Sequence, residues 1–70
     1  MQITGKLTRR GGTWTIRDAA TGRTYELSGE AFPDRAEGLQ AQVVGVTEDS
    51  FGLGVLHDEP VLRVQRWRVV

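Results

Sequence analysis

Five arginines in this sequence stand where they could contact phosphates or the carboxylates of an acidic partner: Arg9, Arg10, Arg17, Arg66 and Arg68. Arg9 and Arg10 precede the pair Gly11-Gly12, and arginines at a hairpin tip can reach backbone phosphates. Arg66 and Arg68 would add charge to the same surface if the last strand lies beside the first. The alternative is that these charges are scattered over a solvated surface.

Charge along the chain is uneven, although the total is zero. Residues 1–35 hold six basic and four acidic side chains, residues 36–59 hold five acidic and no basic ones, and residues 60–70 hold three arginines. A neutral total can therefore conceal a basic patch if the two ends of the chain lie side by side. Zero net charge and the acidic middle segment both argue against a dedicated nucleic-acid binder.

Residue types needed for catalysis or metal binding are sparse. The chain has no cysteine, which excludes disulfides, thiolate metal sites and cysteine nucleophiles. His57 is its one histidine and is interpreted as a surface residue in a turn. The acidic pairs Glu48-Asp49 and Asp58-Glu59 could hold a hard cation, but adjacent acids in turns are usually solvated. No catalytic motif is present, so we predict no enzyme, no metal site and no cofactor.

Alternation of apolar and polar residues predicts a three-stranded antiparallel meander over residues 1–28. Gly11-Gly12 is typical of a tight hairpin turn between the first two strands, and Asp18 with Gly22 favours a turn before the third. Thr13 and Thr15 are predicted to point outward. The residues predicted to face inward are Ile3, Gly5, Leu7, Trp14, Ile16, Tyr25 and Leu27.

Residues 28–38 interrupt the alternation and carry signals for a short helix. Pro33 is suited to the first helical position and Gly38 can end the helix. We therefore predict one or two helical turns within residues 30–38, with Phe32 anchoring them against the bottom of the fold.

The last third of the chain predicts further strands. A fourth strand follows the helix, with Gly45 marking a bend or bulge where the inward phase shifts to Val44 and Val46. Residues 51–56 are either a short strand or an ordered loop, and the place of Phe51 is left open. In the final stretch VLRVQRWRVV the apolar phase slips by one residue, which requires a bulge near residues 65–66 or a strand that changes sheets.

This order of elements, together with two local patterns, resembles the OB-fold. The stretch ITGKL is similar to the first OB strand, where a glycine lets the strand coil around the barrel, and residues 38–45 resemble the pattern G-x-x-V-x-V-x-G of the fourth, with Ala41 in place of the first valine. The resemblance implies one all-β domain over residues 1–70, a five- to six-stranded OB-like barrel with one short helix between strands three and four. In these features the chain is similar to small single-domain bacterial proteins of uncharacterised function.

An SH3-like barrel is the alternative architecture, because it also begins with curved antiparallel strands. The eleven-residue break at residues 28–38 favours the OB-fold, which places its helix there. A β-sandwich is disfavoured because so short a chain offers few strands for two sheets. In the barrel, the strand phases predict one core that includes Trp14, Leu27, Val43, Val64 and Trp67.

Two functions follow as hypotheses. The first is a binding module whose arginines contact single-stranded nucleic acid without reading sequence, or an acidic partner. Its surface would be the one that OB-folds use: the face of strands two and three, with the loop between strands one and two and the loop between strands four and five at its rims. The second is an accessory protein that associates with other proteins through an apolar edge of the stretch QRWRVV and has no ligand. Because no segment approaches the length of a membrane span and MQITGKL lacks a signal-like apolar run, we expect a cytoplasmic protein without membrane contact.

Overall fold

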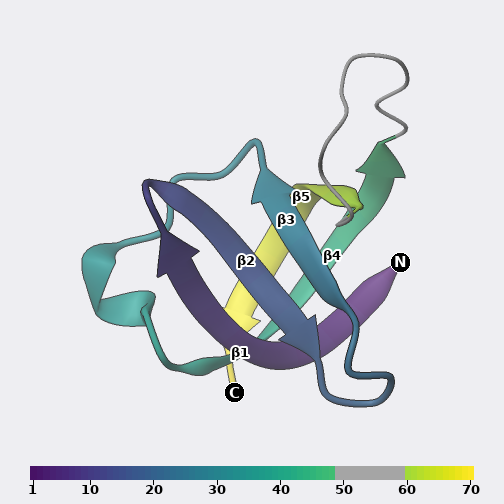
Figure 1. Cartoon of the computed structure of the whole chain (residues 1–70), viewed down its shortest axis with the longest axis horizontal. Coiled ribbons are helices and arrows are strands. Elements are labelled where there is room, and N and C mark those ends of the chain that lie inside the picture. The colour runs from purple at the N-terminus through teal and green to yellow at the C-terminus, as the bar shows by residue number, and fades with distance from the viewer. Residues whose placement is uncertain (49–59) are drawn as a thin grey trace.

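The computed structural model describes residues 1–48 and 60–70 and shows a closed five-stranded β-barrel (Figure 1). Its elements are β1 (Gln2–Arg10), β2 (Thr13–Asp18), β3 (Thr24–Ser28), the 3₁₀ helix η1 (Asp34–Ala36), β4 (Gln40–Glu48) and β5 (Val61–Val69). The strands follow one another around the barrel in the order β1-β2-β3-β5-β4, and β4 pairs again with β1. The mainly β, OB-like barrel predicted from the sequence is confirmed.

Strand β1 is long and curved, and it belongs to both sides of the barrel. Its first half pairs with β4 and its second half with β2, and Gly5 pairs with both, opposite Ala41 and Asp18. A Cβ atom at Gly5 would lie 1.7 Å from the carbonyl oxygen of Arg17, so a side chain cannot be accommodated there. The glycine of ITGKL therefore allows the close strand contact on which barrel closure depends.

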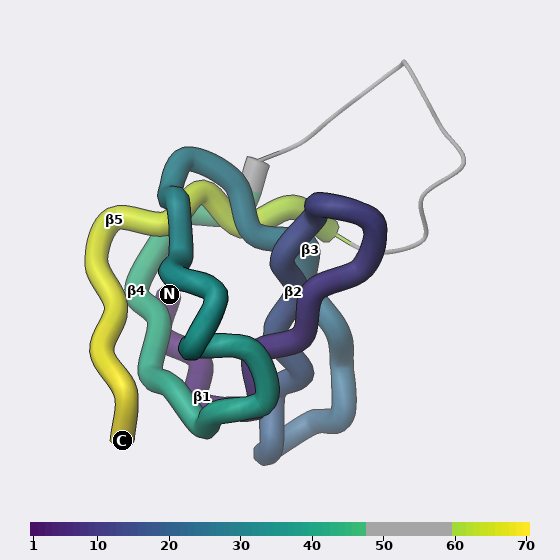
Figure 2. Tube along the Cα trace, turned by 90° about the vertical axis from the view of Figure 1, so that its left-hand side faces the viewer, coloured from purple at the N-terminus to yellow at the C-terminus, as the bar shows by residue number. Residues whose placement is uncertain are grey.

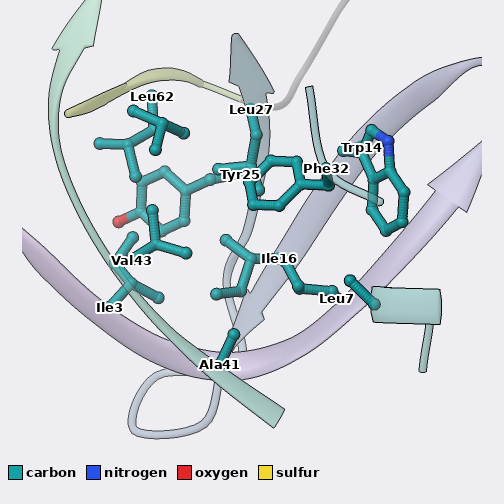
Figure 3. Packing of buried hydrophobic residues seen from close by; sticks show 12 residues of the cluster. Ile3, Leu7, Trp14, Ile16, Tyr25, Leu27, Phe32, Ala41, Val43 and Leu62 are labelled. Carbon is teal, nitrogen blue, oxygen red and sulfur yellow. The ribbon is translucent and has the colours of Figure 1, made fainter. Parts of the chain in front are cut away.

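Inward-facing side chains from all five strands fill the barrel (Figure 3). Ile3, Leu7, Ile16, Val43 and Leu62 are the largest fully buried side chains. Removing the apolar surface of such residues from water supplies most of the stabilisation of a domain this small. The alternation predicted for β1, β2 and β3 is confirmed at its inward positions.

One end of the barrel is covered by the segment that carries η1 (Figure 2). Phe32 is buried between two tryptophans, with ring centroids 5.2 Å from Trp14 and 4.7 Å from Trp67. Pro33 precedes the helix as its N-cap residue, and Gly38 follows it with a φ of +86°. The predicted helix and the anchoring role of Phe32 are therefore confirmed, because Phe32 packs against the barrel end and holds η1 there.

The register between β4 and β5 confirms one prediction and corrects another. Val44 pairs with Arg66 and Gly45 with Val64, so Gln65 is the extra residue of a bulge in β5, where the phase slip predicted it. The predicted phase shift within β4 is wrong: Gly45 is buried, whereas Val46 is 52% exposed. A Cβ at position 45 would lie 2.2 Å from the carbonyl oxygen of Arg63, so only glycine permits this inward position.

Thr15 also departs from its predicted environment. It lies on the outward phase of β2, yet it is only 4% exposed. Thr8 of β1 and Glu26 of β3 stand directly opposite it on the two neighbouring strands. A short side chain on the middle of three strands lies between the side chains of both neighbouring strands, an environment that the alternation alone does not reveal.

Core membership is confirmed for Trp14, Leu27, Val43 and Val64, all of which are buried. Trp67 is half-buried and packs against this core through Phe32. The interpretations placed on residues 49–59 lie outside the described residues, including the possible strand at 51–56, Phe51, His57 and the acidic pairs.

Candidate functional site

Arg9 belongs to the covered end of the barrel. It continues the inward phase of β1, two residues after the buried Leu7, and its guanidinium carbon lies 5.1 Å from the centroid of the Trp14 ring. Its Nη1 donates a hydrogen bond to Oδ1 of Asp34 at 2.8 Å, within an ion pair. A cation over an indole face and an ion pair each contribute modestly at a partly exposed site. Arg9 thus joins the β1–β2 hairpin to η1.

Arg10 faces the opposite side of β1, because successive residues of a strand point to opposite faces. It stands opposite Thr13 next to the hairpin turn. It lies four positions along the strand from Lys6, a distance of about 13 Å. The structure therefore divides the Arg9-Arg10 pair between two surfaces, and the two do not form one charged lip.

The remaining three candidate arginines lie on or beside one continuous surface. We call this surface the Gln–Arg face and define it as the outward side chains where residues 2–6 of β1, 40–44 of β4 and 66–68 of β5 lie side by side, namely Gln2, Thr4, Lys6, Gln40, Gln42, Val44, Arg66 and Arg68. Arg17 of β2 stands at its border, directly opposite Lys6. The last strand does not lie beside the first, since β4 separates β5 from β1.

Strand register arranges the face in rows. Arg66, Val44 and Gln2 form one row across β5, β4 and β1. Arg68, Gln42 and Thr4 form the next. Neighbouring strands lie about 4.8 Å apart and alternate residues of one strand about 7 Å apart. The two guanidinium-bearing residues are therefore presented at a regular spacing from one rigid strand.

The Gln–Arg face contains an open pocket of about 350 Å³, lined by Gln2, Gln42, Val44, Arg66, Trp67 and Arg68. Nε of Arg68 donates a hydrogen bond to Oε1 of Gln42 at 3.2 Å, which orients that guanidinium group along the sheet. Arg66, Arg68 and Lys6 are exposed, whereas Gln42 and Val44 are half-buried between the strands. The site thus combines cationic groups, amide donors and acceptors, and a small apolar patch.

The charged side chains of the Gln–Arg face are all basic. Among the side chains that the structure describes, the carboxylates lie elsewhere, at the end of β2, on β3 and around η1: Asp18, Glu26, Glu30, Asp34 and Glu37. Within the described ranges, Arg66 and Arg68 form no ion pair. Lys6 and Arg17 even stand directly opposite each other, an arrangement that costs stability. The described side chains therefore give this face a net positive charge.

Sequence reasoning missed the residues that complete this face. Lys6 and the glutamines Gln2, Gln40 and Gln42 are not among the candidate binding residues predicted from the sequence. The available signal was compositional, since every outward position of QITGK and QAQV is polar and none is acidic. What the sequence did not contain was the order of the strands, which places β4 between β1 and β5.

Residues 1–48 and 60–70 contain no group of three or more side chains suited to hold a metal ion. No helix in the described part of the chain is long and apolar enough to cross a membrane. Comparison of the chain with protein-family models, with curated proteins and with solved structures yields no match.

Proposed function

We propose that this protein is a small binding module that holds an acidic polypeptide partner on its Gln–Arg face. The observation that carries the proposal is the segregation of charge: Lys6, Arg66 and Arg68 share one sheet surface on which no described carboxylate lies. Arginine recognises carboxylates through paired, charge-assisted hydrogen bonds. Glutamine amides beside them donate and accept hydrogen bonds to a peptide main chain.

An acidic polypeptide fits this face better than a single-stranded nucleic acid does. Proteins that bind single strands stack bases on exposed aromatic rings. Here Trp14, Tyr25 and Phe32 are buried, and Trp67 is packed against Phe32. Affinity from phosphate contacts alone grows with the number of cations, and this face offers only three, with Arg17 at its border. The half-buried Val44 adds an apolar contact suited to a peptide side chain.

Membership among the small OB-like proteins of uncharacterised function belongs to the same proposal. It is supported by the closed barrel, the coiled β1 with Gly5, and the 3₁₀ helix between β3 and β4. A binding role is consistent with a fold that offers a rigid sheet surface and, within the described residues, no catalytic cluster.

Fluorescence anisotropy with labelled poly-L-glutamate tests the proposed function. At low salt we expect saturable binding that weakens strongly as salt is added, because exposed charges are screened within about 10 Å at 0.1 M. The double variant Arg66→Gln/Arg68→Gln should lose about tenfold or more in affinity. A labelled oligothymidylate is titrated in parallel.

A matched control replaces two arginines that are also exposed but lie outside the Gln–Arg face. Arg23 lies in the β2–β3 turn and Arg35 in η1, and both are exposed. The variant Arg23→Gln/Arg35→Gln has the same net charge as the test variant and should bind poly-L-glutamate like the parent protein. Equal losses in both variants would mean that net charge rather than the Gln–Arg face drives binding, and preferential binding of oligothymidylate would overturn the choice of a polypeptide partner.

A further inference from the structure

Strand β5 is paired unequally on its two sides. Along one side it pairs with β4 over its whole length, apart from the bulge at Gln65. Along the other side it pairs with β3 only at residues 61–63, in parallel. Within the described residues no strand lies along that second side at residues 64–69. Figure 2 shows the corresponding end of β5 at the margin of the molecule, beside β4.

The free side of β5 carries hydrogen-bonding groups of the main chain. The N–H of Val70 donates to the carbonyl oxygen of Gln40 at 3.0 Å, so the amide of Val70 points toward β4. In an antiparallel pair, bonded and non-bonded positions alternate. The amides of Arg68 and Arg66 therefore also point toward β4, whereas the N–H and C=O groups of Trp67 and Val69 point away from it.

This edge is accessible to solvent. Val69 is 50% exposed and Val70 is 58% exposed, although both are apolar. Arg66 and Arg68 precede these valines in the chain and are exposed on the outer face. The ring of Trp67 packs on Phe32, so the tryptophan fixes this edge to the covered end of the barrel. An unpaired strand edge of this kind is a template for another extended chain.

We infer that β5 receives the acidic partner as an added β-strand, whose main chain bonds Trp67 and Val69 and whose alternate carboxylates meet Arg66 and Arg68. The inference rests on the proposed function and adds the shape and pattern of the partner. Because side chains of a strand alternate, a segment of acidic, apolar and acidic residues presents its carboxylates to the arginines. Its apolar residues then face the same side as Val69.

A second copy of the chain does not satisfy this edge. In an antiparallel pair of two β5 edges that bonds both Trp67 and Val69, the register places Arg68 opposite Arg68 of the other copy, or Arg66 opposite Arg68 twice. Like charges directly opposite each other on a sheet are destabilising. The charge of the edge therefore selects a chain of opposite charge over its own copy, which is specificity through repulsion.

Hydrogen exchange followed by NMR, with a synthetic acetylated and amidated peptide of alternating glutamate and valine, tests the inference. On saturation with the peptide, we expect exchange of the Trp67 and Val69 amides to slow at least tenfold. The amide of Arg68, already bonded to β4, should change much less. A peptide of the same composition with its glutamates grouped at one end should bind at least tenfold more weakly.

Two matched changes separate main-chain pairing from charge. Methylating the valine nitrogens of the peptide removes the donors that face β5 and keeps every carboxylate, so affinity should fall about tenfold. Val69→Pro removes an N–H that faces the free side and leaves the β4 ladder intact, so it should weaken binding without lowering the melting temperature. If that variant fails to fold, the methylated peptide still decides the matter.

The possible outcomes distinguish the two proposals. Strand addition would be overturned if the methylated and parent peptides bound equally well. It would also be overturned if the amides of Trp67 and Val69 exchanged at an unchanged rate in a complex that Arg66→Gln/Arg68→Gln abolishes. Either result would leave the Gln–Arg face as the site. Failure of the parent peptide and of poly-L-glutamate to bind would overturn both. Protection of Trp67 and Val69 that grows with protein concentration in the absence of peptide would identify a second copy as the occupant and overturn the inference.

Discussion

Arginines in two regions of this barrel have different surroundings. At the covered end, Arg9 lies over Trp14 and pairs with Asp34, so its charge is used to hold η1 to the β1–β2 hairpin. On the Gln–Arg face, Arg66 and Arg68 project from β5 into solvent with no described carboxylate beside them. The same residue type contacts other parts of the fold in one place and is exposed to solvent in the other.

Strand phase explains the difference. Arg9 lies on the inward phase of β1 at the end of the barrel, where its guanidinium group meets the ring of the core residue Trp14. Arg66 and Arg68 lie on the outward phase of β5, opposite Val44 and Gln42. Residue type alone therefore does not identify a binding residue in a β protein, because a shift of one position along the strand moves a side chain to the opposite face.

The largest expected effect comes from Gly5, which belongs to the strand that runs through both regions. Gly5→Ala places a Cβ atom 1.7 Å from the carbonyl oxygen of Arg17, so β1 and β2 must separate. We expect loss of more than about 4 kcal/mol, enough to unfold a domain of this size. Circular dichroism and thermal melting measure it.

Gly11→Ala is the control for this substitution. A Cβ atom at Gly11 meets nothing within 4 Å, but the φ of +55° makes the residue strained. The cost should be about 1–2 kcal/mol, well below that of Gly5→Ala. Similar losses in the two variants would show that backbone freedom, rather than the close contact with β2, explains the glycine at position 5.

The next effect concerns the aromatic layer that covers the barrel end. Phe32→Ala removes the ring between Trp14 and Trp67 and leaves a cavity above the core. Such truncations cost about 3–5 kcal/mol. Urea denaturation measures the loss. Val46→Ala, at a position 52% exposed on β4, is the comparison and should change stability by less than about 0.5 kcal/mol. A small effect of Phe32→Ala would mean that η1 does not cover the barrel.

Much of the fold was predictable because its signals are local. Alternation identified the inward faces of β1 to β3, the Pro33 and Gly38 pair bracketed η1, and the phase slip in the last strand located the bulge at Gln65. Each of these signals arises from the geometry of a few consecutive residues. Where the strand phase was read correctly, the core residues followed from it.

Features that depend on strand order were not predictable in the same way. Burial of Thr15 comes from neighbours on two other strands, and the need for glycine at position 45 comes from its close contact with β5. The candidate site shows the same division. Arg66 and Arg68 were identified by residue type, whereas Lys6 joined them only through the position of β4. The pairing of Arg9 with Asp34 joins residues far apart in the sequence and has no local signal.

A smaller effect is expected from Arg9 itself. Arg9→Ala removes an ion pair whose side chains are 37% and 86% exposed, together with the contact over Trp14. After allowance for solvent screening, the two contacts contribute about 1 kcal/mol. That corresponds to a fall of about 4–8 °C in melting temperature for a domain of this length.

A double-mutant cycle with Asp34→Ala separates the contributions at this end of the barrel. The coupling energy between Arg9 and Asp34 should be below about 1 kcal/mol, and the remainder of the Arg9→Ala effect is assigned to Trp14. Arg9→Lys keeps the charge but loses the planar group that stacks on the indole, so it should retain part of the stability. An Arg9→Ala protein with the melting temperature of the parent would remove the distinction between the two regions.

The smallest expected effect on stability comes from the Gln–Arg face. Arg66→Gln/Arg68→Gln removes two charges and one exposed hydrogen bond, from Arg68 to Gln42, and buries nothing new. Loss of that bond and relief of repulsion from Lys6 oppose each other, so the net change should be within about 0.5 kcal/mol. Thermal melting at low and high salt separates the two contributions, because screening removes the repulsion in the parent protein and not the hydrogen bond. We therefore expect replacement of arginine to lower the melting temperature at the covered end and to lower partner affinity at the Gln–Arg face. A double variant on β5 that destabilises the barrel as much as Arg9→Ala would assign these arginines to the fold and remove the basis for a binding site there.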